Sequence, residues 1–133
     1  MGIADSKVNE NFFSQYLGMR CEHADMCEID RRVKKGIYDR KEYERAIAWV
    51  REYCREGQDY NSRELAHSRA EKDAVWEYNV KMTMIIRDMM VDNEVLRESG
   101  FDEEANGHNA IASGFQGHLT VMQQLYPQTY TAF

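Results

Sequence analysis

The sequence of 133 residues has very little proline and no long apolar run. Its single proline, Pro127, leaves the remaining chain free to form long helices, because proline removes a backbone donor and breaks helix interiors. No stretch approaches the roughly 18 uncharged apolar residues of a membrane span, and the N-terminus lacks the basic start and apolar core of a signal peptide. The three cysteines, an odd number, do not fit a secreted disulfide framework. We therefore expect a cytoplasmic protein without membrane contact.

Recognisable catalytic motifs are also absent. The chain contains no G-x-S-x-G, no phosphate-binding glycine loop and no G-x-G-x-x-G. These patterns place a nucleophile on a sharp turn or bring backbone amides close to phosphates, so their absence removes support for nucleophilic and dinucleotide-dependent enzymes. We expect a protein that is not an enzyme and that needs no cofactor.

The apolar residues that are present follow helical spacing. They predict an all-α fold, a bundle of about five helices forming a single helical domain over residues 1–133. The expected helices cover residues 6–18, 22–35, 39–57, 62–99 and 108–126. Asp39 and Glu42 form a capping-box pattern that opens the third of these helices. The apolar face of the fourth is expected along residues 75–96 and includes Met82 and Ile85. The fourth, without glycine or proline, would be longer than a compact domain of this size is wide, so we expect a break near Asp92 and Asn93.

The last 29 residues, 105–133, contain no Asp, Glu, Lys or Arg, although charged residues make up 30% of the chain. Charges are excluded where desolvation is costly, so this run predicts a core, an interface or a ligand pocket. Small residues on one face of the expected last helix would allow another backbone to approach closely. The interface residues predicted on this basis are Ala110, Ser113, Gly114, Gly117, Phe115, Leu119 and Met122.

Basic residues gather between residues 31 and 55, although the net charge is −6. This block is the one electrostatic footprint in the sequence for phosphate. The histidines and amides of the uncharged run could add neutral contacts to a ligand. The candidate ligand or phosphate contacts are Arg31, Arg32, Lys34, Lys35, His108, Asn109 and His118. The alternative is a solvated helix face paired to local acids.

Two metal hypotheses rest on short spacings. Cys21, His23 and Cys27 fall within seven residues and could begin a zinc site. The alternative, which we favour, treats Cys27 and Cys54 as small buried residues in reduced surroundings. Four carboxylates at helical spacings could hold Mg²⁺ for nucleotide hydrolysis if the two pairs faced each other. These carboxylates are Glu22, Asp25, Asp88 and Asp92. We commit to no metal site.

The absence of a complete catalytic set, together with the uncharged run, favours a non-enzymatic interaction protein. We expect a small acidic helical regulator, adaptor or inhibitor, of the kind that phages direct against nucleic-acid-binding host complexes. Its partner would be another protein or a protein–nucleic-acid complex, and it would form a homo-oligomer without binding nucleic acid directly. One alternative is a small-ligand or nucleotide-binding protein, and another is a metal-dependent nucleotide hydrolase.

Overall fold

The computed structural model describes residues 10–58, 60, 62 and 66–114. In these ranges the chain forms five helices and no strand, which confirms the predicted all-α class. The helices are α1 (Glu10–Leu17), α2 (Met26–Lys35), α3 (Arg40–Tyr53), α4 (Arg69–Met90) and α5 (Glu94–Glu98). None of the helices in the described ranges is both long and apolar enough to cross a lipid bilayer.

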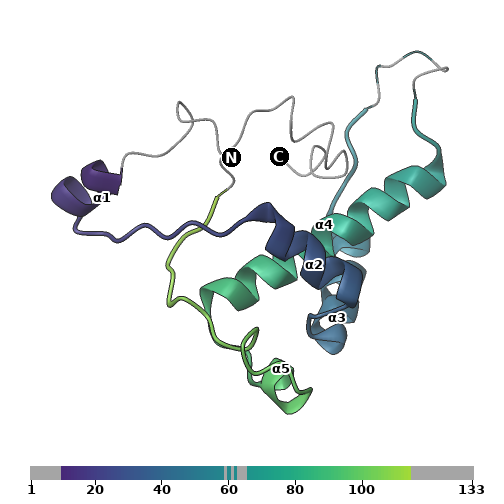
Figure 1. Cartoon of the computed structure of the whole chain (residues 1–133). Helices are drawn as coiled ribbons and strands as arrows, with labels where there is room; N and C mark the ends of the chain where they lie inside the picture. Colours follow the sequence, from purple (N-terminus) through teal and green to yellow (C-terminus); the bar gives the residue numbers. More distant parts are fainter. Residues whose placement is uncertain (1–9, 59, 61, 63–65, 115–133) are drawn as a thin grey trace.

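Helix α4 is the centre of the fold, and α2 and α3 both pack against it (Figure 1). Ile29 of α2 meets Met82 and Ile85 of α4, which are 2% and 0% exposed. A second, smaller core joins the end of α2 to α5 through Ile37, Leu96 and Ala105. The apolar spacing along residues 75–96 thus predicted the buried face correctly.

Side-chain caps determine where the helices begin. Asp25 accepts a hydrogen bond from the Cys27 amide, and Asp39 accepts from the amides of Lys41 and Glu42. Such caps satisfy amides that have no partner inside the helix. The first residue of α2 is therefore Met26, four residues later than predicted, whereas α3 begins where its cap predicted.

The predicted helix over residues 62–99 is wrong in its bounds. Ser68 and Glu71 form a reciprocal capping box, so α4 starts at Arg69 rather than near residue 62. The expected break is confirmed: α4 ends at Met90, and Asn93 caps α5 by accepting from the Val95 amide at 3.1 Å. The 22 residues of α4 extend over about 33 Å at 1.5 Å per residue, which fits a domain of this size.

Residues 105–110 pass along the C-terminal end of α4 in a non-helical conformation. The amides of His108 and Ala110 donate to the carbonyls of Met89 and Met90, each at 2.9 Å. These are carbonyls that a helix end leaves without internal partners. The predicted helix is therefore wrong over residues 108–114, because the backbone donors there cap α4 instead; its remainder lies outside the described residues.

Candidate functional site

Four charged residues join α2 to the turn after α5. Glu28 accepts from Arg31 Nε at 2.7 Å and from Arg32 Nε at 2.8 Å. Arg31 Nη2 also donates to Glu104 Oε1 at 2.6 Å, and Arg32 Nη1 donates to the Glu104 carbonyl at 3.1 Å. We call Glu28, Arg31, Arg32 and Glu104 the ion-pair cluster. The cluster connects α2 to a residue more than 70 positions later in the chain, because Arg31 and Arg32 both donate hydrogen bonds to Glu104.

Charge pairing sets the acid–base properties of this cluster. The hydrogen bond from Arg31 holds the pKa of Glu28 at about 2, well below its usual 4.5. The same guanidinium lowers the pKa of Glu104, and its two carboxylate partners raise the pKa of Arg31. Carboxylates with such low pKa values are poor proton acceptors near neutral pH. The ion-pair cluster therefore holds structure together and does not supply a general base.

Asp88 lies beside this region with opposite properties. Its side chain is 2% exposed, Oδ1 accepts from Asn93 Nδ2 at 2.8 Å, and buried Oδ2 has no hydrogen-bond partner. Burial raises the pKa of Asp88, because the charged form loses its hydration. Since Asn93 also caps α5, the Asp88–Asn93 pair determines the geometry of the turn between α4 and α5.

The extended segment before α2 reaches the same end of α4. His108 Nδ1 lies 2.5 Å from Glu22 Oε2, and the Gly107 amide donates to Asp92 Oδ1 at 2.9 Å. A Cβ at Gly107 would lie 2.4 Å from the carbonyl carbon of Val91, so the two backbones meet where only glycine fits. These contacts hold together three separate segments of the chain, 20–25, 89–93 and 105–110.

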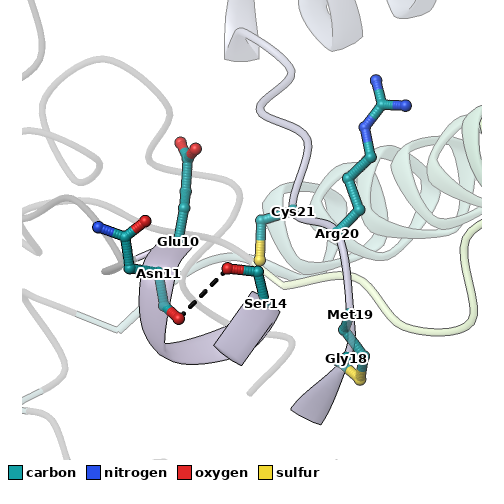
Figure 2. Close-up of a pocket in the computed structure, with 7 residues that line it drawn as sticks. All are labelled: Glu10, Asn11, Ser14, Gly18, Met19, Arg20 and Cys21. Carbon is teal, nitrogen blue, oxygen red and sulfur yellow. Dashed lines mark hydrogen bonds between the residues drawn. The ribbon is translucent and has the colours of Figure 1, made fainter. Parts of the chain in front are cut away.

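One open hollow of about 450 Å³ lies next to α1. Figure 2 shows Glu10, Asn11 and Ser14 on the helix side and Gly18, Met19, Arg20 and Cys21 on the other. The Ser14 hydroxyl donates to the Asn11 carbonyl at 3.3 Å, so its proton is used within the helix. Among the described residues, no hydrogen bond joins Ser14 or Cys21 to a basic side chain in this hollow.

The candidate phosphate contacts of α2 lie close to carboxylates. Arg31 and Arg32 are committed to carboxylates, and Lys34 Nζ lies 2.6 Å from Asp30 Oδ2. Lys35 is exposed on the last turn of α2. Carboxylates therefore pair with three of these four residues, Arg31, Arg32 and Lys34, and phosphate binding by the block stays a prediction.

The remaining candidates for ligand contacts are two histidines and one asparagine. His108 pairs with Glu22, and Asn109 is exposed with a positive φ of 51°. His118 lies outside the described residues. In the described part of the chain, no hydrogen bond or ion pair joins His108 or Asn109 to Arg31 or Arg32, and their role in binding a ligand stays a prediction.

The metal candidates are not brought together either. Within the described ranges, no three His, Cys, Asp or Glu side chains are placed to hold an ion. His23 lies 2.9 Å from Glu10, Cys27 is exposed and Cys21 is partly buried. Asp25 caps α2 while Asp88 is buried, so the four carboxylates serve separate structural roles.

The predicted interface residues fall on both sides of the described boundary. Ala110, Ser113 and Gly114 are described, whereas Phe115, Gly117, Leu119 and Met122 lie outside. A Cβ added at Gly114 would have no atom of the described residues within 4 Å. Residues 110–114 are not helical, so the helical face that grouped the predicted interface residues does not form there. An interface at these residues stays a prediction.

Sequence reasoning missed Glu104, Asn93 and Gly107 as organising residues. Glu104 is the last charged residue before the uncharged run, and this position was a signal that it holds the start of that run. The close approach at Gly107 left no local signal, because it depends on a partner backbone 16 residues earlier.

The described part of the chain is thus a helical domain whose charged residues fix its own segments together. The family described as L-fucose isomerase, second N-terminal domain, matches residues 1–130. The chain belongs to this family.

Individual relatives also indicate this family. The chain is 57% identical over 119 residues to an L-fucose isomerase of Bacteroides fragilis. It is 56% identical over 120 residues to that of Bacteroides thetaiotaomicron and 56% over 117 residues to that of Streptococcus pneumoniae. Each match covers 88% of this chain and 20% of the relative, so the chain spans about one fifth of the length of these relatives.

These matches overturn the functional predictions from the sequence. The prediction of a non-enzymatic regulator, adaptor or inhibitor is wrong, because the family and the relatives are those of an enzyme. The expected protein or protein–nucleic-acid partner is wrong for the same reason, and neither alternative function describes a sugar isomerase. The error came from treating a missing catalytic set as a sign of no catalysis, although a domain can carry only a share of an active enzyme.

Proposed function

We propose that this chain works as the second N-terminal domain of an L-fucose isomerase and contributes to the isomerisation of L-fucose. The observation that carries the proposal is the 57% identity over 119 residues, 88% of the chain, to an enzyme of that name. Identity at this level across nearly the whole chain supports the same fold and the same place in the enzyme.

Within that enzyme, we assign the described residues a positioning role. The ion-pair cluster and the Asp88–Asn93 pair fix residues 105–110 against the end of α4. Those residues begin the uncharged run, whose lack of charge suits a desolvated contact. The domain thus holds the start of this run in one place for the rest of the isomerase.

The organisation proposed for the chain is a single helical domain over residues 1–133 acting in the cytoplasm. All three cysteines lie in the described part of the chain and none is in a disulfide, which suits a reducing compartment.

A chimera tests the proposed function. The matching segment of the B. fragilis L-fucose isomerase is replaced by this chain, and kcat/KM for L-fucose is compared with the parent enzyme. We expect a value within about tenfold of the parent, a difference of about 1.4 kcal/mol in the activation barrier. A chimera that assembles and melts like the parent but does not isomerise L-fucose would overturn the proposal.

A matched pair of variants separates positioning from general stability. In the chimera, Arg32→Met removes the bond to the Glu104 carbonyl, whereas Lys34→Met in the same helix removes an exposed ion pair. We expect Arg32→Met to lower kcat/KM at a temperature where both variants remain folded, and Lys34→Met to have no effect. Equal activities would contradict the positioning role.

A further inference from the structure

His108 and Asn109 are adjacent residues of the segment that passes along the C-terminal end of α4. The His108 amide donates to the Met89 carbonyl and the Ala110 amide donates to the Met90 carbonyl, each at 2.9 Å. Asn109 lies between these two hydrogen bonds, so the backbone of both residues is fixed on α4. Both side chains are exposed, and they are therefore presented at a defined place on the surface.

Asn109 has a strained backbone conformation. Its φ of 51° lies in the left-handed region and is the one positive φ of a non-glycine residue in the described part of the chain. Glycine adopts this region without a steric cost, whereas a residue with a Cβ does not. The Asn109 side chain makes no hydrogen bond to another described residue that would offset the strain. Strain of this kind concentrates at functional sites, which indicates that the amide serves a contact outside the described residues.

A carboxylate orients the neighbouring imidazole. His108 Nδ1 lies 2.5 Å from Glu22 Oε2, and the other oxygen of Glu22 lies 2.8 Å from Arg20 Nη2. Figure 1 shows the segment before α2, which carries Glu22, crossing the segment after α5, which carries His108. An ionised carboxylate only accepts hydrogen bonds, so the neutral ring carries its proton on Nδ1 and a lone pair on Nε2.

The other ring nitrogen is open to a ligand. The His108 side chain is 56% exposed, and Nε2 makes no hydrogen bond or ion pair to another described residue. Nε2 is an acceptor, while the Asn109 amide beside it supplies one acceptor and two donors. Neighbouring sugar hydroxyls, each of which donates and accepts, match such a pair. An anion is disfavoured, because the carboxylates of Glu22 and Asp92 lie beside His108 and the Gly107 amide.

We propose that His108 Nε2 and the Asn109 amide bind secondary hydroxyl groups of the sugar substrate, and that Glu22 is the positioning residue that orients His108. The inference rests on the proposed function, from which the identity of the sugar is taken. It adds the residues of this chain that contact the sugar. Another segment of the isomerase, whose backbone also offers hydrogen-bonding groups, is the competing occupant.

Binding of L-fucose to the B. fragilis chimera and to its variants tests these contacts. His108→Phe keeps a flat ring without nitrogen, and Asn109→Gly removes the amide while allowing the positive φ. Glu103 is an exposed carboxylate in the turn after α5, and Glu103→Gln is the control. Isothermal titration calorimetry gives the Kd of L-fucose and of its 2-, 3- and 4-deoxy derivatives for each protein.

We expect His108→Phe and Asn109→Gly each to weaken L-fucose binding about fivefold, the size of one neutral hydrogen bond, and Glu103→Gln to leave it unchanged. The loss should be missing for the one deoxy derivative that lacks the hydroxyl contacted by the substituted residue, because only that sugar never made the contact. A merely structural role would weaken the binding of all four sugars equally. Equal losses for all four sugars, or no loss, would overturn the contacts.

Glu22→Gln tests the positioning role. The glutamine amide can donate to Nδ1 or accept from it, so the ring can carry its proton on either nitrogen. We expect Glu22→Gln to weaken L-fucose binding about threefold when His108 is present and to have no effect in the His108→Phe background. An equal effect in both backgrounds would contradict the positioning of His108 by Glu22.

Thermal melts of the chimera identify the competing occupant. A His108→Phe variant with a lower melting temperature and unchanged Kd values would assign the side chain to a contact with another segment of the isomerase and overturn sugar binding. A chimera that binds the four sugars in the expected pattern without isomerising L-fucose would contradict the proposed function and leave the sugar contacts standing. A chimera that assembles and melts like the parent but binds none of the sugars would overturn both.

Discussion

Arg32 of α2 donates a hydrogen bond from Nη1 to the main-chain carbonyl of Glu104 at 3.1 Å, although 72 residues separate them. The arginine is only 7% exposed, so this bond and the pairing with Glu28 satisfy a charge that would otherwise be costly to bury. The contact ties the helical core to the residues that precede the uncharged run.

Loss of this arginine should destabilise the domain. Arg32→Met leaves the Glu104 carbonyl without its donor and weakens the pairing of Glu28, and we expect a cost of about 2–3 kcal/mol in the free energy of unfolding. Urea denaturation followed by circular dichroism measures it. Lys34→Met is the control, since its side chain is 74% exposed and surface pairs contribute about 0–1 kcal/mol. Equal effects of the two substitutions would contradict the assigned role of Arg32.

Glu28 should make the domain sensitive to acid. Its pKa is lowered from 4.5 to about 2 by Arg31 and Arg32, so its contribution to stability is complete above pH 4.5. The contribution is lost as the pH falls from 4.5 toward 2, because the unfolded chain takes up the proton first. Thermal melts across this range should show a shallower pH dependence for Glu28→Gln than for the unchanged chain. If the melting temperatures of the two proteins depend on pH to the same extent, the pairing of Glu28 does not persist in solution.

Asp88 should change the stability of the domain with pH in the opposite direction to Glu28. Burial raises its pKa above 3.8, so the unfolded state loses its proton first as the pH rises. The associated loss of stability begins above the unfolded pKa and is complete once the pH exceeds the folded value. Asp88→Asn keeps an oxygen to accept from Asn93 and removes the charge, and we expect it to raise the melting temperature at neutral pH. A lower melting temperature with unchanged pH dependence would contradict this account.

Gly107 should tolerate no side chain. In Gly107→Ala the new Cβ would lie within 2.7 Å of three backbone atoms of Val91, so the two segments must separate. We expect a loss of about 1–3 kcal/mol, measured by urea denaturation. Gly114→Ala is the matched control in the same segment, where no atom of the described residues lies within 4 Å of the added Cβ, and it should be neutral or slightly stabilising. A neutral Gly107→Ala would show that the close approach is absent in solution.

Local patterns predicted the helices well and their bounds less well. Asp39 was recognised as the cap of α3, and the spacing around Met82 and Ile85 predicted the core face of α4. The start of α4 was misplaced, because several polar residues between 61 and 71 resemble caps and only the completed Ser68–Glu71 box shows which one operates. The helix expected from His108 failed because propensity was outweighed by backbone bonds to the end of α4.

The sequence by itself determined the all-α class, the α3 cap, the apolar core of α4 and the break after it, since these depend on residues within a few turns of one another. Only the tertiary structure decided that Arg31 and Arg32 pair with Glu28 and Glu104, and that Asp88 is buried while Asp25 is a cap. Partners more than 70 residues apart leave no local periodicity. The ion pairs and close backbone contacts of such residues can be identified only when the packed helices bring the residues together.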